Sequence, residues 1–126
     1  MVLRRRKIEP ETGLVAVHAW LANPATLPRP DLATAVRFTL EELAARVPGP
    51  TTEVRVPPFG AVQCIAGPKH TRGTPPNVVE TDPQTWLALA LGIGNWDDAV
   101  ATGAVRASGQ RADLSGVLPL TGLIPE

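Results

Sequence analysis

Proline and glycine interrupt this chain so often that a bundle of long helices does not fit it. The 126 residues include fourteen prolines and eleven glycines, and these residues end helices and strands or form the turns between them. The sharpest break is Pro48-Gly49-Pro50. Before it, apolar residues recur at helical spacing, and after it they alternate with polar residues. We therefore predict one domain of short helices and short strands.

Two helices are expected before this break. The first should begin at Pro10, a favoured first-turn residue, and end at Asn23-Pro24, because the residue before a proline disfavours helix. Its apolar face would hold Leu14, Val17 and Leu21. The second should begin at Pro30-Asp31. Its apolar stripe consists of Leu32, Val36, Leu40, Leu43 and Val47.

The rest of the chain predicts strands and two further helices. Residues 51–56 and 61–65 show the period-two pattern of half-buried strands, as do 77–80 and 104–108. In the second strand, Val62 and Cys64 share one face. A helix should follow the capping residue Asp82 and another should follow Asn95, with Val100 packed inward. We expect a last short helix over residues 110–117.

Adjacent carboxylates at Asp97 and Asp98 raise the question of acid–base chemistry. Neighbouring helix side chains point about 100° apart, so these two do not converge on one reacting atom. In the first turn after Asn95 they meet free N–H groups and the positive end of the helix dipole. We interpret them as part of a helix start.

Polar candidates for a binding site are few. His70 and Arg72 lie in the loop AGPKHTRGTPP, residues 66–76, and Arg55 lies on a strand; each is a candidate contact for the polar head of a ligand. No nucleophile or carboxylate accompanies His70 in a recognisable motif, so an enzyme based on His70 and Arg72 is the least favoured hypothesis. Cys64 and the two histidines have no metal-ligand spacing. We expect no catalytic residue, metal or cofactor.

Charge and composition narrow the function further. Four of the twelve positive charges lie in Arg4-Arg5-Arg6-Lys7, which leaves eight against twelve negative charges, a net −4, in residues 8–126. We expect residues 1–7 to be a basic tail and 8–126 to be one domain without the basic face of a nucleic-acid binder. No apolar stretch approaches the roughly 18 residues of a membrane span. No signal peptide is evident, and one cysteine fits the reducing cytoplasm.

Apolar residues gather near the end of the chain, where the sequence GVLPLTGLIP carries no charge. Such a segment either closes the core, forms the lid of a hydrophobic cavity, or binds a partner. A second copy of the chain is one such partner. The residues concerned are Val117, Leu118, Leu120, Leu123 and Ile124.

From residue 77 onward the sequence resembles the sterol carrier protein 2 superfamily. The stretch TDPQTWLALALGIGNWDDAVATGAVRASGQRADLSGVLPL carries the resemblance through the helix that ends at Gly92, Ala99, Gly103 before a strand, Ser108-Gly109, and the apolar segment 114–120. The whole chain, including RVPPFGAVQCIAGPKHTRGTPPNVVETD, is similar to small stand-alone bacterial proteins of that superfamily. It differs from eukaryotic members in lacking a lysine-rich surface and in its proline-rich 66–76 loop.

The resemblance implies an α+β sandwich, with a curved, mainly antiparallel sheet of about five strands and helices on one face. It also implies a non-enzymatic carrier of lipids, fatty acyl chains or sterol-like molecules in an apolar cavity between sheet and helices, which we expect to reach roughly 300 Å³. The alternative is a protein-interaction or accessory module without a lipid. The expected cavity residues are Val62, Cys64, Val79, Trp86, Ala90, Val105, Leu114, Leu118 and Leu120.

Overall fold

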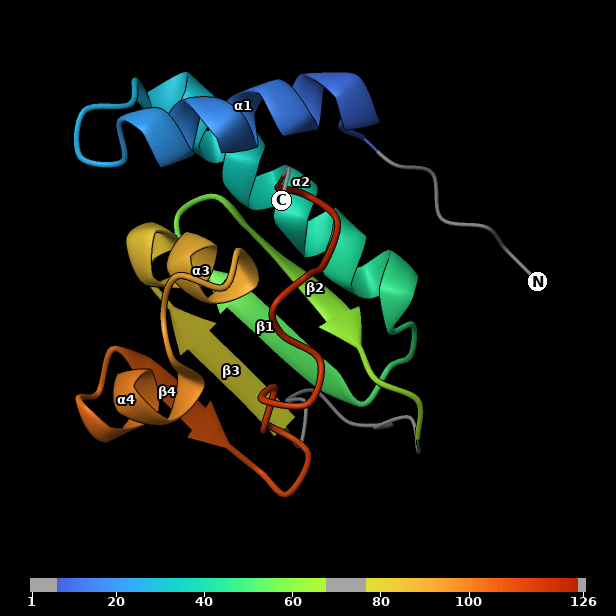
Figure 1. Cartoon of the computed structure of the whole chain (residues 1–126). Coiled ribbons are helices and arrows are strands. Elements are labelled where there is room, and N and C mark those ends of the chain that lie inside the picture. The colour runs from blue at the N-terminus through green and yellow to red at the C-terminus, as the bar shows by residue number, and fades with distance from the viewer. Residues whose placement is uncertain (1–6, 68–76, 125–126) are drawn as a thin grey trace.

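Four helices and four strands make up the described part of the chain, which is residues 7–67 and 77–124 of a computed structural model (Figure 1). In chain order they are α1 (Pro10–Ala22), α2 (Arg29–Arg46), β1 (Thr52–Val56), β2 (Gly60–Cys64), β3 (Asn77–Thr81), α3 (Pro83–Ala90), α4 (Trp96–Ala101) and β4 (Val105–Ser108).

Side-chain caps begin the two short helices, as the sequence predicted. The Asp82 carboxylate accepts a hydrogen bond from the Thr85 N–H at 2.9 Å at the start of α3. The Asn95 side-chain oxygen accepts one from the Asp98 N–H at 3.0 Å at the start of α4. Each bond satisfies a backbone donor that the first helical turn leaves without a partner.

The four strands form one mixed sheet in the order β2-β1-β3-β4. β1 pairs antiparallel with β2 and β3 pairs antiparallel with β4, but β1 and β3 run parallel, with Thr52 opposite Asn77. The expectation of about five mainly antiparallel strands is therefore only partly met within the described residues. β2 brings the chain back to the end of the sheet at which β1 begins. β3 starts from that same end on the other side of β1, so β1 and β3 run parallel.

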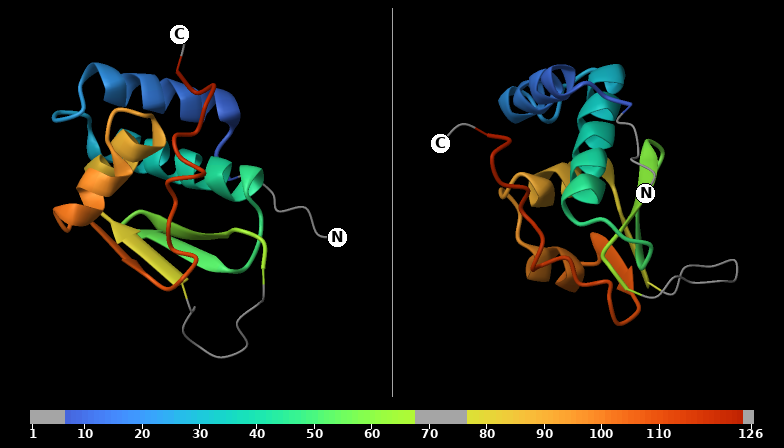
Figure 2. Two further views of the ribbon diagram at one scale, coloured as in Figure 1. Left: turned by 60° about the horizontal axis from the view of Figure 1, so that its bottom comes forward. Right: turned by 90° about the vertical axis from the view of Figure 1, so that its right-hand side faces the viewer.

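Strand alternation gives the sheet two different faces. Val54, Val56 and Val79 are buried on the face toward the helices. Glu53 and Arg55 alternate with them and lie on the opposite, outer face. Figure 2 shows the helices and the end of the chain gathered on one side of the sheet. Helices on one face were expected.

Helix α2 lies at the centre of the helical layer and contacts α1, α3 and β2. α1 approaches it closely because Gly13 faces the ring of Phe38. The predicted stripe of α1 was therefore displaced: Trp20 is buried, whereas Leu14 and Leu21 are only half-buried. The buried residues of α1 are Gly13, Ala16, Val17 and Trp20.

The end of the chain departs from two predictions. Residues 110–117 form turns rather than a helix. Val100, which we expected to pack inward, is 41% exposed, and α4 as a whole has no buried residue. We call residues 109–124 the C-terminal segment. It runs between α2 and α3 across the core face of the sheet in both figures (Figures 1 and 2).

Candidate functional site

The nine residues expected to line an apolar cavity gather in one region between sheet and helices. All nine belong to, or pack against, one continuous hydrophobic cluster. Val62 and Leu118 are half-buried. The other seven are at most 3% exposed, which leaves almost no water-sized space against their surfaces: Cys64, Val79, Trp86, Ala90, Val105, Leu114 and Leu120.

Trp86 is the largest side chain of this region, and its polar atom is fully satisfied. Its Nε1–H donates to the Thr39 hydroxyl at 2.8 Å, and that hydroxyl lies 2.8 Å from the Ala35 carbonyl oxygen, to which it donates. Sequence reasoning missed Thr39. The only available signal was a polar residue beside the apolar stripe of α2, since Thr39 is adjacent to Leu40.

The C-terminal segment is attached to the sheet at its beginning. The Arg111 N–H donates to the Asn77 side-chain oxygen at 2.9 Å, and the Thr52 hydroxyl donates to the Arg111 carbonyl at 2.6 Å. Two residues further on, the backbone N–H and the hydroxyl of Ser115 bond the carboxylate of Asp113 and lower its pKa. The segment therefore starts as a well-defined turn on the first residues of β1 and β3.

Farther along, the same segment is held to the helices by few polar contacts. The Leu120 N–H donates to the Ala90 carbonyl at 2.8 Å. The Nε2 atom of His18, in α1, lies 3.1 Å from the carbonyl oxygen of Leu123. A carbonyl oxygen can only accept a hydrogen bond, so this bond requires a hydrogen on Nε2. The segment otherwise relies on buried apolar side chains, namely Ala112, Leu114, Leu120 and Leu123.

The polar candidates do not join this apolar region. Arg55 lies on the outer face of the sheet, where its Nε donates to the Glu53 carboxylate. A residue on that face cannot meet a ligand held between sheet and helices. His70 and Arg72 lie outside the described residues.

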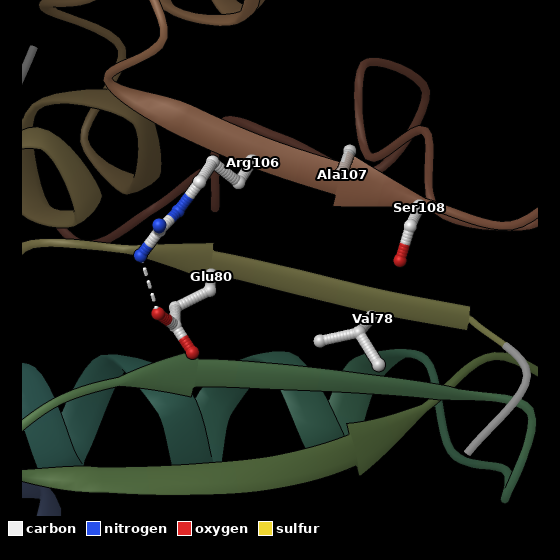
Figure 3. Close-up of a pocket in the computed structure, with 5 residues that line it drawn as sticks. All are labelled: Val78, Glu80, Arg106, Ala107 and Ser108. Carbon is white, nitrogen blue, oxygen red and sulfur yellow. Dashed lines mark hydrogen bonds and ion pairs between the residues drawn. The ribbon is translucent and has the colours of Figure 1, made fainter. Parts of the chain in front are cut away.

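A shallow, open depression of about 270 Å³ lies between strands β3 and β4. Figure 3 shows its lining, in which Arg106 reaches the Glu80 carboxylate at 2.7 Å. The lining residues are Val78, Glu80, Arg106, Ala107 and Ser108. Three of them, Glu80, Arg106 and Ser108, carry polar side chains, so this surface is unlike the apolar cavity that the sequence predicted.

Cys64 is a free thiol, completely buried at the end of β2. Burial raises the pKa of this thiol from its ordinary value of 9.0 to about 11, because a thiolate loses its hydration there. A thiol that stays protonated is a poor nucleophile. This environment supports the interpretation of Cys64 as a core residue.

The pKa of Cys64 gives the first testable prediction. Above pH 9 the thiol of the unfolded chain loses its proton, whereas the folded chain keeps it until about pH 11. The folded state then binds more protons, so the free energy of unfolding should fall as pH rises through this window, by up to about 1.4 kcal/mol per pKa unit. Urea unfolding across this window should show the fall in the wild type. Cys64→Ala should lack this component, and an identical slope in both proteins would contradict the assignment.

Asp97 and Asp98 are exposed in the first turn of α4, as expected of a helix start. No group of three or more His, Cys, Asp or Glu side chains in residues 7–67 and 77–124 is arranged to hold a metal ion. None of the helices described is long and apolar enough to cross a membrane.

These features define a class of protein: a small α+β domain whose apolar core is closed on one side by a segment without regular secondary structure. The family model described as bacterial SCP ortholog, for sterol carrier protein, matches residues 28–120. The chain belongs to this bacterial sterol carrier protein-like family. The match runs from the residue before α2 to Leu120 and includes all nine apolar residues named above. No curated protein matches the chain.

Proposed function

We propose that this protein binds and carries a small apolar or amphipathic molecule, a lipid, fatty acyl chain or sterol-like compound, without acting on it chemically. The observation that carries this proposal is family membership over residues 28–120, which suggests a lipid-carrier role. We propose the cytoplasm as its location, because its single thiol is free and a reducing compartment keeps thiols in that form.

The ligand would occupy the region between sheet and helices that Leu114 and Leu120 now fill. Both side chains belong to the C-terminal segment, and neither lies in a helix or strand. The segment could therefore move away without breaking a helix or the sheet. Burial of apolar surface stabilises the folded protein by roughly 25 cal/mol per Å². An acyl chain that takes the place of these two side chains would replace the stabilisation that their burial provides.

The polar head of such a ligand would lie close to Arg111, which follows β4 where the C-terminal segment begins. The Arg111 guanidinium donates to the Ala66 carbonyl at 3.2 Å, at the start of the connection that contains His70 and Arg72. We keep His70 and Arg72 as proposed contacts for such a head. Arg55 is left out because it lies on the outer face.

The alternative function, a protein-interaction or accessory module, relied on an exposed apolar end of the chain. Leu120 and Leu123 are at most 6% exposed, and they cover the core of their own chain. These two residues are therefore not free to bind a partner or a second copy. The carrier function accounts better for the same residues.

The test is native mass spectrometry of freshly purified protein, followed by organic extraction and identification of what co-purifies. We expect one apolar molecule per chain, or one-to-one binding of a fluorescent fatty acid when nothing co-purifies. Leu120→Gln should weaken the packing that the ligand has to displace and so speed association of the fatty acid about tenfold, since removal of a buried apolar contact costs 1–3 kcal/mol.

Val100→Gln is the matched control, because Val100 is exposed on α4. Its association rate should equal that of the wild type. The proposal fails when neither a co-purified molecule nor fatty-acid or sterol binding is found up to the solubility limit. Equal acceleration in both variants would show that the C-terminal segment does not fill the region that the ligand enters.

A further inference from the structure

Three of the six described arginines form ion pairs, and three, Arg29, Arg37 and Arg111, do not. Arg46 pairs with Glu42, Arg55 with Glu53, and Arg106 with Glu80. The Arg111 guanidinium donates to a backbone carbonyl. Within residues 7–67 and 77–124, Arg29 and Arg37 form no ion pair. Their positive charges are therefore not neutralised by a carboxylate of the described chain.

Both of these side chains come from α2 and meet the same residue, Phe59, in the turn between β1 and β2. The Arg29 guanidinium carbon lies 5.2 Å from the centroid of the Phe59 ring. The Arg37 Nε–H donates to the Phe59 carbonyl at 2.8 Å, and its terminal N–H groups bond no other described residue. The same turn exposes Pro57 and Pro58. Two cations and an apolar turn therefore share one surface.

The nearest acidic residues of α2 form no ion pair with Arg29 or Arg37 in the described part of the chain. The Glu41 carboxylate, one turn after Arg37, accepts the backbone N–H groups of Lys7 and Ile8, each at 3.0 Å. Asp31, in the first turn of α2, makes no ion pair with Arg29 among the described contacts. Both guanidinium groups therefore remain without a carboxylate partner among the described residues.

We propose that Arg29, Arg37 and the Pro57-Pro58 turn form a docking surface for an anionic lipid bilayer. Guanidinium groups bind phosphate oxygens with paired N–H donors, and basic residues near an anionic membrane contribute about 1 kcal/mol each. Proline has no N–H to leave unsatisfied at the headgroups. The docking surface goes beyond the proposed function and holds whether or not the core accepts a ligand.

The experiment is co-sedimentation with vesicles of phosphatidylcholine, with and without a minority of phosphatidylglycerol, at low salt. We expect the wild type to bind the anionic vesicles and not the neutral ones. The double variant R29Q/R37Q should lower the partition coefficient roughly thirtyfold, from about 1 kcal/mol per residue. The matched control is R46Q/R106Q, which removes the same charge from two ion-paired sites and should bind like the wild type.

Other outcomes overturn the docking surface. An equal loss in R46Q/R106Q would mean that only total charge matters. Unchanged binding in R29Q/R37Q, with loss in R4Q/R5Q/R6Q, would assign the attraction to the start of the sequence. Equal binding to neutral vesicles, or binding of inorganic phosphate without vesicle binding, would also refute it. Fatty-acid binding, measured without vesicles, tests the carrier function separately.

Discussion

Trp86→Ala should lower the free energy of unfolding by about 3–5 kcal/mol, the range for a large aromatic residue removed from a packed core. Trp86 is 1% exposed and its Nε1–H donates to Thr39, so the substitution removes both apolar contacts and a buried hydrogen bond. Small domains are stable by only about 5–15 kcal/mol. Urea unfolding followed by circular dichroism should show a large decrease in the midpoint.

Trp96→Ala provides the control, because Trp96 is half-buried at the start of α4. It loses less apolar contact and should lower the free energy of unfolding by clearly less than Trp86→Ala. Equal losses, or a loss below about 1.5 kcal/mol for Trp86→Ala, would contradict a packed interior, since an open cavity has few contacts to lose. Trp86→Phe keeps a ring and separates the apolar contribution from the hydrogen bond.

A packed interior also sets what ligand binding requires. Because the side chains around Trp86 leave little room, a bound lipid has to take the place of protein atoms. The C-terminal segment is the part of this interior that can leave most easily, since its buried leucines belong to no helix or strand. The buried leucines of the C-terminal segment therefore stabilise the core, and the same leucines have to move before a ligand can bind.

Local signals in the sequence predicted local structure well. The capping residues Asp82 and Asn95 and the period-two strands were all confirmed. These signals depend on neighbouring residues only, because a cap bonds a backbone N–H three residues away. The shared face of Val62 and Cys64 also follows from strand alternation alone.

Features that depend on distant parts of the chain were not predicted. The parallel pairing of β1 and β3 is set by how the chain crosses between strands, and no residue in either strand encodes it. The helix expected over 110–117 did not form. There Leu114 is buried without a helix around it, and its carbonyl accepts the N–H groups of Val117 and Leu118 in a turn. Tertiary packing overrides such weak helix propensity.

The candidate site shows the same division. The resemblance named Val79, Trp86 and Val105 as interior residues, and the structure buries all three. Arg55 was assigned to a ligand's polar head although its alternation with Val54 already pointed to the opposite face. Whether buried residues surround a hollow or fill it depends on side-chain volumes across several elements, and no sequence pattern reports that.

Gly13→Ala should destabilise the protein although alanine is the better helix former. A methyl group at this position would overlap the ring of Phe38, so α1 and α2 would have to separate or the ring would have to turn. Overpacking of this kind costs about 1–3 kcal/mol or more, while alanine gains about 1 kcal/mol in helix propensity. We expect a net loss of about 1–2 kcal/mol, measured by urea unfolding.

Two comparisons isolate the contact with Phe38. Gly116→Ala should have little effect, because nothing lies within 4 Å of a Cβ at that position. In a Phe38→Ala background the ring is absent, so Gly13→Ala should become neutral or stabilising, and the double-mutant cycle should give a coupling of about 1–3 kcal/mol. Additive effects would mean that α1 does not rest on the Phe38 ring. In that case the close approach of α1 and α2 could not be attributed to the small residues of α1 rather than to its leucines.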